Sequence, residues 1–499
     1  MKMKKNILTF VSALYAAMII SINPTSAQSS ISLQQKVEEI TESDALRDAV
    51  VGICARKGDG QVLIDIASHD LLVPASNMKL ISTGAALHML GGDYRYKTGI
   101  GYAGDIVDSV LVGDLYIIGG GDPTIASKDS IAAPVEHTFA VWERMIRDAG
   151  INKISGRVIG SSGDFFSGMN EEPSWMWSDI GTYYGAGVSG LMFYENIQSF
   201  EVAAGAQVGD AVNIKASYPQ VPWMEFRYDC STGKAGSGDQ LYMYTSDLAP
   251  VAEIRGTFAV DRKPKRVDCS NKFPELTCAH YFNRWLNDHG LKCSTEAGDD
   301  KLLKLDFPDS MHIIGHTSSP TLRRIAYETN HASNNLYAET LLKTLGKELR
   351  NEGSYDSSYV AVKNILEKLG VKTSIGFKLQ DGSGLSRKNF VSPDFFCRYL
   401  EAMMGSECFE DFVESLPSPG GTGTLSSNMK DYPAEIKNRI KAKSGSMEGV
   451  RCYSGYIIPS EGCKDDTIVF SIMVNNCTAP SWKVRPLLDK IMGILAESN

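Results

Sequence analysis

Three short segments that combine serine with lysine or asparagine are separated by very unequal lengths of chain. They are Ser76-Asn77-Met78-Lys79, Ser333-Asn334-Asn335 and Lys443-Ser444-Gly445. A lysine three residues after a serine shares its helix face and can activate its hydroxyl, and S-x-x-K, S-x-N and K-T-G form a known motif set. Lys79 and Ser333 are 254 residues apart (333 minus 79). If the three segments share one pocket, the residues between the first two must fold as an insertion.

Similar segments elsewhere lack a suitable context. S-x-x-K also begins at Ser231, among several glycines, and at Ser427, where Pro433 follows within two helical turns, so neither predicts a long helix. Lys97-Thr98-Gly99 precedes any S-x-N segment and is typical of an ordinary strand. Only Ser76 opens a long apolar helix, expected over 78–90, and it is therefore the candidate nucleophile.

The composition indicates a large globular protein with several domains. The 499 residues are 43% hydrophobic and 22% charged, and at about 150 residues per domain they predict about three domains. The net charge of −9 argues against nucleic acid as a partner. We expect the domain that carries the motifs over 28–95 and 313–499, an inserted α/β domain over 96–196 and 262–312, and a β-rich piece over 197–261 nested within it.

The N-terminus predicts export. Three lysines within the first five residues precede an apolar run over 7–22, and small residues end at Ala27, which is the pattern of a signal peptide over 1–27. The run is short for a membrane span and no stop-transfer charges follow it, so we expect no stable membrane anchor. The predicted location is the periplasm, with the protein soluble or loosely associated with the cell wall. In an exported protein, the ten cysteines favour one or more structural disulfides.

Periodicity and turn residues predict both helices and strands, although no repeat. Helices are expected over 33–47, 78–90, 140–149, 277–289, 325–346, 359–370 and 486–496, and strands over 50–56, 62–66, 156–159, 451–458 and 467–475, with further strands in 94–118 and 200–260. The last helix carries few charges, so we expect it to pack on a sheet rather than lie in lipid.

Other catalytic arrangements find little support. None of the eight histidines belongs to an HExxH or another metal-ligand spacing, so we expect neither a metal nor another cofactor. Asp381-Gly382-Ser383-Gly384 is similar to the nucleophile loop of a serine protease, but nothing in the sequence places the histidine and acid of a triad.

The chain resembles the class C low-molecular-weight penicillin-binding proteins, which are D-alanyl-D-alanine carboxypeptidases and endopeptidases similar to penicillin-binding protein 4. The matching segments span most of the chain after residue 27: 74–79, 115–123, Trp177, Asp179, 184–189, 330–345, 381–386, 420–425 and 441–456. The departures are small, with Ser444 where threonine is more usual and Asn334 where aspartate is common. The resemblance implies a multi-domain α/β fold whose catalytic domain, similar to the serine β-lactamases and transpeptidases, has an antiparallel sheet flanked by helices.

The resemblance also gives catalytic roles to three side chains. Ser76 Oγ would attack the carbonyl of the penultimate D-Ala of a peptidoglycan stem peptide and form an acyl-enzyme. Lys79 would be the base, provided that burial or a neighbouring cation such as Lys443 lowers its pKa from ~10.4 in water. Ser333 would relay a proton to the leaving D-Ala amine. β-Lactams would acylate the same serine as covalent inhibitors.

Two further side-chain groups would bind the substrate. Asn335 would hold the Lys79 ammonium and a substrate amide. Lys443 and the Ser444 hydroxyl would bind the terminal carboxylate.

Backbone groups complete the implied site. Gly445 would let substrate backbone lie close to a strand. The backbone N–H groups of Ser76 and Ser446 would form the oxyanion hole. Asp179 would either contact the substrate or make a structural hydrogen bond.

Three other functions stay open on the sequence. The same site could serve a D,D-endopeptidase that cuts peptidoglycan cross-links. A β-lactamase fits less well, because no dedicated deacylation carboxylate can be located. A non-catalytic peptidoglycan-binding or β-lactam-sensing protein would normally carry a signalling or membrane segment, and none is recognisable after Ala27.

Overall fold

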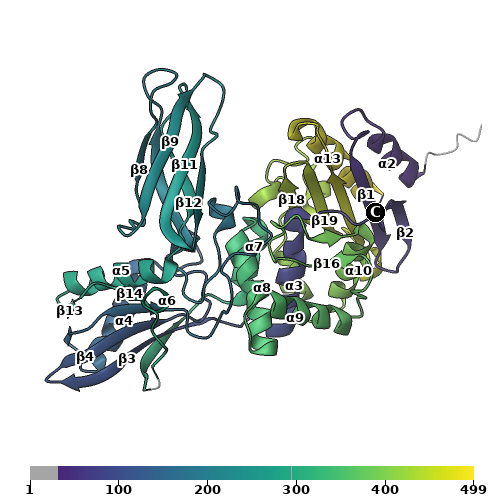
Figure 1. Ribbon diagram of the computed structural model, residues 1–499. Helices are drawn as coiled ribbons and strands as arrows, with labels where there is room; N and C mark the ends of the chain where they lie inside the picture. The colour runs from purple at the N-terminus through teal and green to yellow at the C-terminus, as the bar shows by residue number, and fades with distance from the viewer. Residues whose placement is uncertain (1–31, 294, 309, 499) are drawn as a thin grey trace, which may run out of the picture.

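A computed structural model describes residues 32–293, 295–308 and 310–498. The predicted signal peptide, 1–27, lies outside the described residues. No helix in the described part of the chain is long and apolar enough to span a bilayer. Figure 1 shows the inserted residues as a lobe beside the domain that carries the three motifs.

The motif-bearing domain is built on a five-stranded antiparallel sheet that both ends of the chain form together. The strand order is β18 (Ile440–Met447), β19 (Val450–Ile457), β20 (Ile468–Asn475), β1 (Val50–Lys57) and β2 (Val62–Ile66). β1 pairs with β20 along its whole length. All eight residues of β20 are buried, as expected for a central strand covered on both faces. This pairing joins the two parts of the domain across the insertion.

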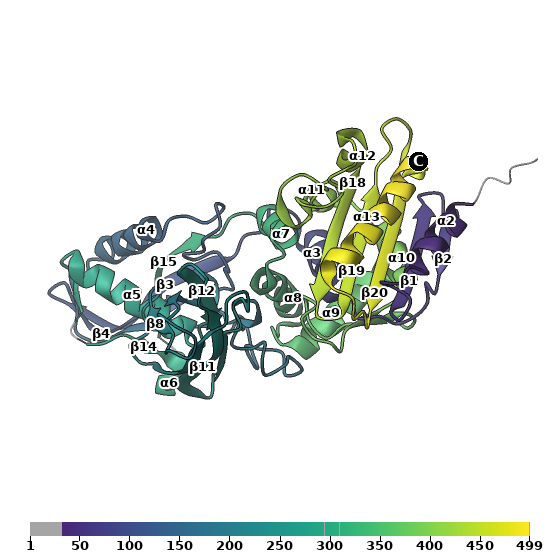
Figure 2. The ribbon, with the colours of Figure 1, turned by 90° about the horizontal axis from the view of Figure 1, so that it is seen from above.

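Helices cover both faces of this sheet, and the period of two along each strand divides its side chains between them. Ile53 and Ala55 face a core shared with α2 (Leu33–Thr41) and α13 (Ser481–Glu497). Cys54 faces the opposite core. That core also contains residues of α3 (Met78–Leu90), α7 (Leu322–His331), α8 (Asn335–Arg350), α9 (Tyr355–Lys368), α10 (Pro393–Met404) and α11 (Phe409–Glu414). Figure 2 shows α13 lying along the sheet. The predicted antiparallel sheet flanked by helices is confirmed.

The inserted lobe contains a mixed seven-stranded sheet. Its main path is β13 (Lys292–Cys293), β5 (Lys153–Ile154), β4 (Val110–Ile118), β3 (Lys97–Val107) and β15 (His312–Ser318), and β6 (Val158–Ser161) pairs with both β4 and β14 (Gly298–Asp299). Phe139 and Trp142 of α4 (Val135–Asp148) and Phe282 of α5 (Pro274–Asp288) pack together in its core. Short helix α6 (Asp300–Leu303) follows β14.

Two three-stranded sheets make the nested β-rich part, which rises above the mixed sheet in Figure 1. One contains β12 (Lys265–Ser270), β7 (Ile197–Ala203) and β8 (Asn213–Ala216), and the other β10 (Tyr242–Ser246), β11 (Ala249–Ala259) and β9 (Glu225–Gly233). Apolar residues from both sheets form one buried core. We expected the β-rich piece to end at residue 261, but β12 lies beyond that point because it pairs with β7. Likewise, β15 extends to Ser318, past the expected boundary at 312, because it pairs with β3.

The predicted disulfides were wrong. The described residues include all ten cysteines, and all ten are free thiols. The buried thiols lie in different cores: Cys54, Cys397 and Cys452 in the motif-bearing domain, Cys278 in the mixed-sheet lobe and Cys269 in the β-rich part. They fill space there as small apolar side chains.

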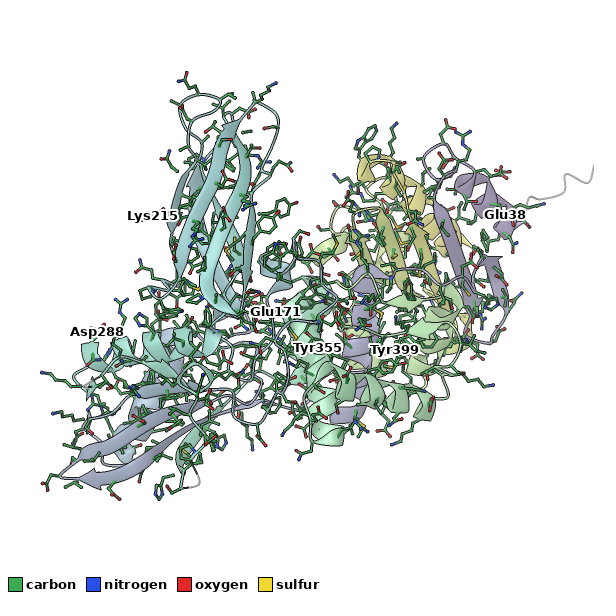
Figure 3. All side chains as sticks on the ribbon, viewed as in Figure 1. Glu38, Glu171, Lys215, Asp288, Tyr355 and Tyr399 are labelled. Atoms are coloured by element: carbon green, nitrogen blue, oxygen red, sulfur yellow. The ribbon has the colours of Figure 1, made fainter. Side chains whose placement is uncertain are left out.

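Residues 165–192, which we call the crossover segment, attach the inserted lobe to the motif-bearing domain. Phe166 and Val188 of this segment are buried in the helical core of that domain. Lys343 of α8 donates to the carbonyl oxygens of Met169 (3.2 Å) and Val188 (3.4 Å). A buried ion pair (2.6 Å) joins Glu171 of this segment to Lys272, which lies just after β12. Figure 3 labels Glu171 between the two lobes.

Candidate active site

The candidate nucleophile lies in a tight turn that is held against the main sheet. Ser76 belongs to the 3₁₀ turn η1 (Ala75–Asn77), which continues directly into α3. Ala75 has φ of 45°, a backbone conformation that costs a non-glycine residue free energy and is found mainly where surrounding contacts enforce it. One such contact is a hydrogen bond of 2.7 Å from Asn77 Nδ2 to Ser454 Oγ on β19. The turn leaves Ser76 half-buried at the start of a rigid helix.

Lys79 lies one helical turn further on and contacts three separate parts of the chain. Its Nζ is 3.0 Å from Ser76 Oγ, 2.7 Å from Asn335 Oδ1 and 2.9 Å from the carbonyl oxygen of Ser383. The side chain is fully buried. Burial lowers the pKa of Lys79 to about 7, although the carboxylates of Glu339 and Asp381 act in the opposite direction. A lysine with this pKa can accept the serine proton near neutral pH.

A buried carboxyl group holds the loop whose carbonyl contacts Lys79. Glu339 of α8 accepts hydrogen bonds from the backbone N–H groups of Gly382 (2.9 Å) and Ser383 (2.7 Å). Burial and the neighbouring Asp381 raise the pKa of Glu339 to about 8. From the sequence, residues 381–384 were notable only for a similarity to a protease loop and as part of a family match. The structure shows instead that Ser383 contributes its backbone oxygen, which no side-chain motif indicates.

The second motif occupies a break between two helices. We expected one helix over 325–346, but α7 ends at His331 and α8 begins at Asn335. Ser333, between them, has φ of 59°. Asn334 caps α8 by accepting from the N–H of Tyr337 (3.1 Å). Asn335 points its amide oxygen at Lys79 and donates from Nδ2 to the carbonyl of Tyr184 in the crossover segment (2.8 Å).

The third motif lies on edge strand β18 beside the other two. Lys443 is fully buried and donates to Ser333 Oγ (3.0 Å) and to the carbonyl of Ser444 (2.8 Å). Burial, and then the like charge of Lys79, lower the pKa of Lys443 well below its usual value. The Ser444 hydroxyl donates to Thr424 Oγ1 (3.0 Å), a partner that the motif alone does not indicate.

Gly445 serves to bring the strand close to the nucleophile turn. A Cβ at this position would lie 2.6 Å from the carbonyl oxygen of Pro74 and 3.0 Å from Asn77 Oδ1. We expected the glycine to admit substrate backbone. Its closest neighbour is instead the turn that carries Ser76, so any side chain here would push β18 away from the nucleophile.

A pocket of about 850 Å³ lies between the two lobes and reaches part of this arrangement, while Lys79 and Lys443 are buried behind its lining. Ser76, Ser333, Asn335, Ser446 and Asp179 are among its lining residues. The crossover segment, loop 384–387, the end of β18 and strand β10 of the nested part form its other walls. In the described part of the chain, no cluster of three or more His, Cys, Asp and Glu side chains is placed to hold a metal ion.

Asp179 has both a structural contact and a position on the pocket wall. Its Oδ1 accepts a hydrogen bond from the Tyr184 hydroxyl (3.2 Å). Burial raises the pKa of Asp179, whereas this hydrogen bond and the charge of Arg387, another lining residue, lower it. Asp179 can therefore make a structural hydrogen bond and still contact a substrate in the pocket.

The segments rejected on context lie in ordinary structure. Ser427 Oγ accepts from Arg485 Nη1 (2.9 Å), and Ser427 lies outside any helix. Lys97 begins strand β3, and Ser231 lies in strand β9.

Comparison with protein families gives a match over residues 33–493 to the model of the D-Ala-D-Ala carboxypeptidase 3 (S13) family. The chain belongs to this family. Its members are serine peptidases, which agrees with the predicted resemblance and with a site built on Ser76.

Individual relatives cover nearly the whole chain. A D-alanyl-D-alanine carboxypeptidase of Actinomadura sp. is 29% identical over 463 residues, which are 90% of this chain and 82% of the relative. The D-alanyl-D-alanine carboxypeptidase DacB of Haemophilus influenzae is 24% identical over 480 residues, 93% of this chain and 92% of the relative. The crystal structure of penicillin binding protein 4 (dacB) from H. influenzae superimposes with a TM-score of 0.77 at 21% identity, covering 93% of this chain and 98% of that one, and it shares the fold.

Asn334, which stands where the family often has aspartate, contacts a carboxylate of the inserted lobe. Asn334 Nδ2 donates to Glu195 Oε2 (2.9 Å), while Glu195 Oε1 accepts from Ser127 Oγ (3.0 Å) and the N–H of Lys128 (3.2 Å). Glu195 itself has φ of 56°. An aspartate at 334 would face this carboxylate with a like charge, which accounts for the amide in this chain.

We predict that Asn334→Asp lowers the free energy of unfolding by about 1–3 kcal/mol at pH 7.5, because two carboxylates then replace a hydrogen-bonded pair. Thermal unfolding measures the loss. Adding Glu195→Gln restores an amide opposite a carboxylate and should recover most of the stability. The loss should also shrink at pH 5, where one of two adjacent carboxyls is protonated. An undiminished loss in the double variant would contradict this pairing.

Proposed function

We propose that this chain is a serine-type D-alanyl-D-alanine carboxypeptidase that removes the terminal D-Ala from peptidoglycan stem peptides through a Ser76 acyl-enzyme, and that β-lactams acylate the same serine. The contact of Lys79 Nζ with Ser76 Oγ (3.0 Å), made by a lysine whose pKa is lowered to about 7, is the observation that carries the proposal. Membership of the S13 family supports it.

Acylation begins with transfer of the Ser76 hydroxyl proton to the neutral amine of Lys79. Ser76 Oγ then forms a bond to the carbonyl carbon of the penultimate D-Ala, and the bond from this carbon to the nitrogen of the terminal D-Ala breaks. The departing nitrogen takes a proton from the Ser333 hydroxyl, which lies 3.0 Å from Lys443 Nζ. The proton that Lys79 accepted from Ser76 restores this hydroxyl, so that Lys79 is neutral again when the acyl-enzyme has formed. The N–H groups of Ser76 and Ser446 would stabilise the oxyanion, a contribution that is typically worth ~10²–10³ in rate per donor.

Substrate binding itself favours the active charge state. Lys79 and Lys443 are both buried, and each positive charge disfavours the other. A substrate carboxylate bound at Lys443 and Ser444 stabilises the charged form of Lys443, and that charge in turn favours the neutral form of Lys79. The terminal carboxylate that identifies a carboxypeptidase substrate thus helps to generate the base.

Deacylation uses the same groups in reverse. Lys79 takes a proton from water, the resulting hydroxide attacks the ester carbonyl, and the proton returns to Ser76 Oγ as the acyl group leaves. The shortened stem peptide and one D-Ala are the products. No further residue is needed to balance the reaction.

The proposed place of action is the periplasm, because the sequence pattern of residues 1–27 predicts export and peptidoglycan is the substrate.

A second candidate activity is that of a D,D-endopeptidase, which would use the same acylation steps on a cross-linked peptide. The pocket supports this second activity, because its volume of about 850 Å³ is larger than the volume that a D-Ala-D-Ala dipeptide fills.

We predict that the rate of acylation by a penicillin falls about tenfold per pH unit below pH 7 and is level above it. Lys79 is charged below its pKa of about 7 and then cannot accept the serine proton. Stopped-flow acylation between pH 5 and 9 measures this dependence. A rate independent of pH over that range would exclude Lys79 as the base.

We predict that purified protein forms a covalent adduct with a fluorescent penicillin and releases D-alanine from a diacyl tripeptide ending in D-Ala-D-Ala. Both properties should disappear in Ser76→Ala. Ser427→Ala is the matched control, since its S-x-x-K segment is identical in sequence but its hydroxyl contacts Arg485 instead of a lysine amine.

The substrate assay also separates the alternatives. Cleavage of a cross-linked muropeptide without release of D-Ala from the tripeptide would favour the endopeptidase. Labelling without either activity would favour a β-lactam sensor, and labelling that survives Ser76→Ala would refute the proposed nucleophile.

A further inference from the structure

Four aromatic side chains line the pocket or pack against its lining, and they take no part in the mechanism above. We call Trp177, Tyr183, Tyr242 and Tyr244 the aromatic wall. The first three have exposed fractions of 59%, 57% and 43%, high values for large apolar side chains. Tyr183, Tyr242 and Tyr244 line the same pocket as Ser76. Trp177, the fourth member, stacks on Tyr244. Exposed apolar surface gathered at a pocket marks a binding region.

The wall is built jointly by two parts of the chain. Trp177 and Tyr183 belong to the crossover segment, whereas Tyr242 and Tyr244 belong to strand β10 of the nested part. The rings of Trp177 and Tyr244 lie 6.4 Å apart at an angle of 26°. The Arg255 guanidinium lies 5.9 Å from the Tyr244 ring centre. These contacts hold flat rings in place while leaving them accessible.

The course of β18 indicates which part of the substrate reaches this wall. The strand runs from Lys443, where the terminal carboxylate binds, past Ser446 at the reacting carbonyl to Met447. A peptide aligned with it extends its N-terminal residues toward Met447 and Glu448, which line the pocket beside Arg387 of the facing loop. Arg387 also lies close to Asp179 of the crossover segment, whose pKa its charge lowers against the larger opposing effect of burial, and Trp177 precedes Asp179 by two residues. The wall therefore receives groups N-terminal to the D-Ala pair.

In peptidoglycan, the N-terminal end of a stem peptide is joined to a muramyl sugar. One face of a pyranose ring carries C–H groups, and aromatic rings bind this face while polar groups bind the hydroxyl and acetamido groups. The pocket supplies both kinds of partner, because Lys128, Asp129 and Asp268 also line it. Lys128 and Asp268 form an ion pair (2.7 Å) at its edge.

We propose that the aromatic wall binds the muramyl saccharide of the substrate, so that this enzyme prefers stem peptides that are still attached to glycan. The inference rests on the proposed carboxypeptidase activity and deepens it. It also gives the nested β-rich part a function, namely to supply one half of a saccharide site.

The test compares kcat/KM for a disaccharide pentapeptide and for the same pentapeptide without sugar. We expect the unaltered enzyme to prefer the glycan-linked substrate, and Trp177→Ala and Tyr244→Ala each to reduce the ratio of the two kcat/KM values about 3- to 10-fold. Tyr228→Ala is the control, because this tyrosine is exposed on β9 of the same nested part but does not line the pocket, and it should leave the ratio unchanged. Labelling by a fluorescent penicillin verifies that each variant is folded.

The other outcomes of this experiment would contradict either the saccharide proposal or the proposed function, and they differ from each other. If Trp177→Ala and Tyr244→Ala reduced kcat/KM equally for both substrates, or for neither, the saccharide proposal would be overturned. A selective loss on a sugar-free cross-linked peptide dimer would also overturn it and assign the wall to a second stem peptide. Failure of the unaltered enzyme to release D-Ala from either substrate, with penicillin labelling intact, would instead refute the proposed function.

Discussion

The charge on one buried lysine constrains the rest of the structure. Lys79 Nζ contacts the Ser76 hydroxyl, the Asn335 amide oxygen and the Ser383 carbonyl, and these partners come from three distant parts of the sequence. A buried ammonium group is tolerated only where acceptors surround it, and a buried neutral amine is a base only where its charged form is disfavoured. The site meets both conditions at once, because burial lowers the pKa of Lys79 to about 7 while three acceptors remain within 3.0 Å.

The insertion takes part in this arrangement. The carbonyl of Tyr184, in the crossover segment, fixes the Asn335 amide so that its oxygen faces Lys79. Glu195, which lies just after the crossover segment, holds Asn334 and with it the turn that contains Ser333. The inserted lobe thus orients the S-x-N motif, and the pocket between the lobes is the consequence of the same contacts. Loosening the crossover segment would disturb the motif as well as the pocket wall.

Local sequence was sufficient to predict several elements that carry the proposed catalytic side chains. Ser76, Lys79 and Lys443 were predicted from motif order and from the apolar run that makes α3, and β1 was predicted as a strand. Local sequence could not predict the break at Ser333, because the helical pattern continues through 325–346 and only tertiary contacts impose its left-handed backbone. The Ser383 and Tyr184 contacts use backbone oxygens, which every residue type offers. Local sequence also could not show that β12 pairs with β7 or that β15 pairs with β3, because these partners are distant in sequence.

The ionisation of Lys79 is the most direct test. Selective isotope labelling of the lysine side chains, with Lys79→Arg to assign the signal, allows the amino group to be titrated by NMR in the free enzyme. A midpoint near pH 7 is predicted, because desolvation outweighs the neighbouring carboxylates. A midpoint near 10, the value of a solvated lysine, would mean that Lys79 stays charged at neutral pH and would contradict its role as the base.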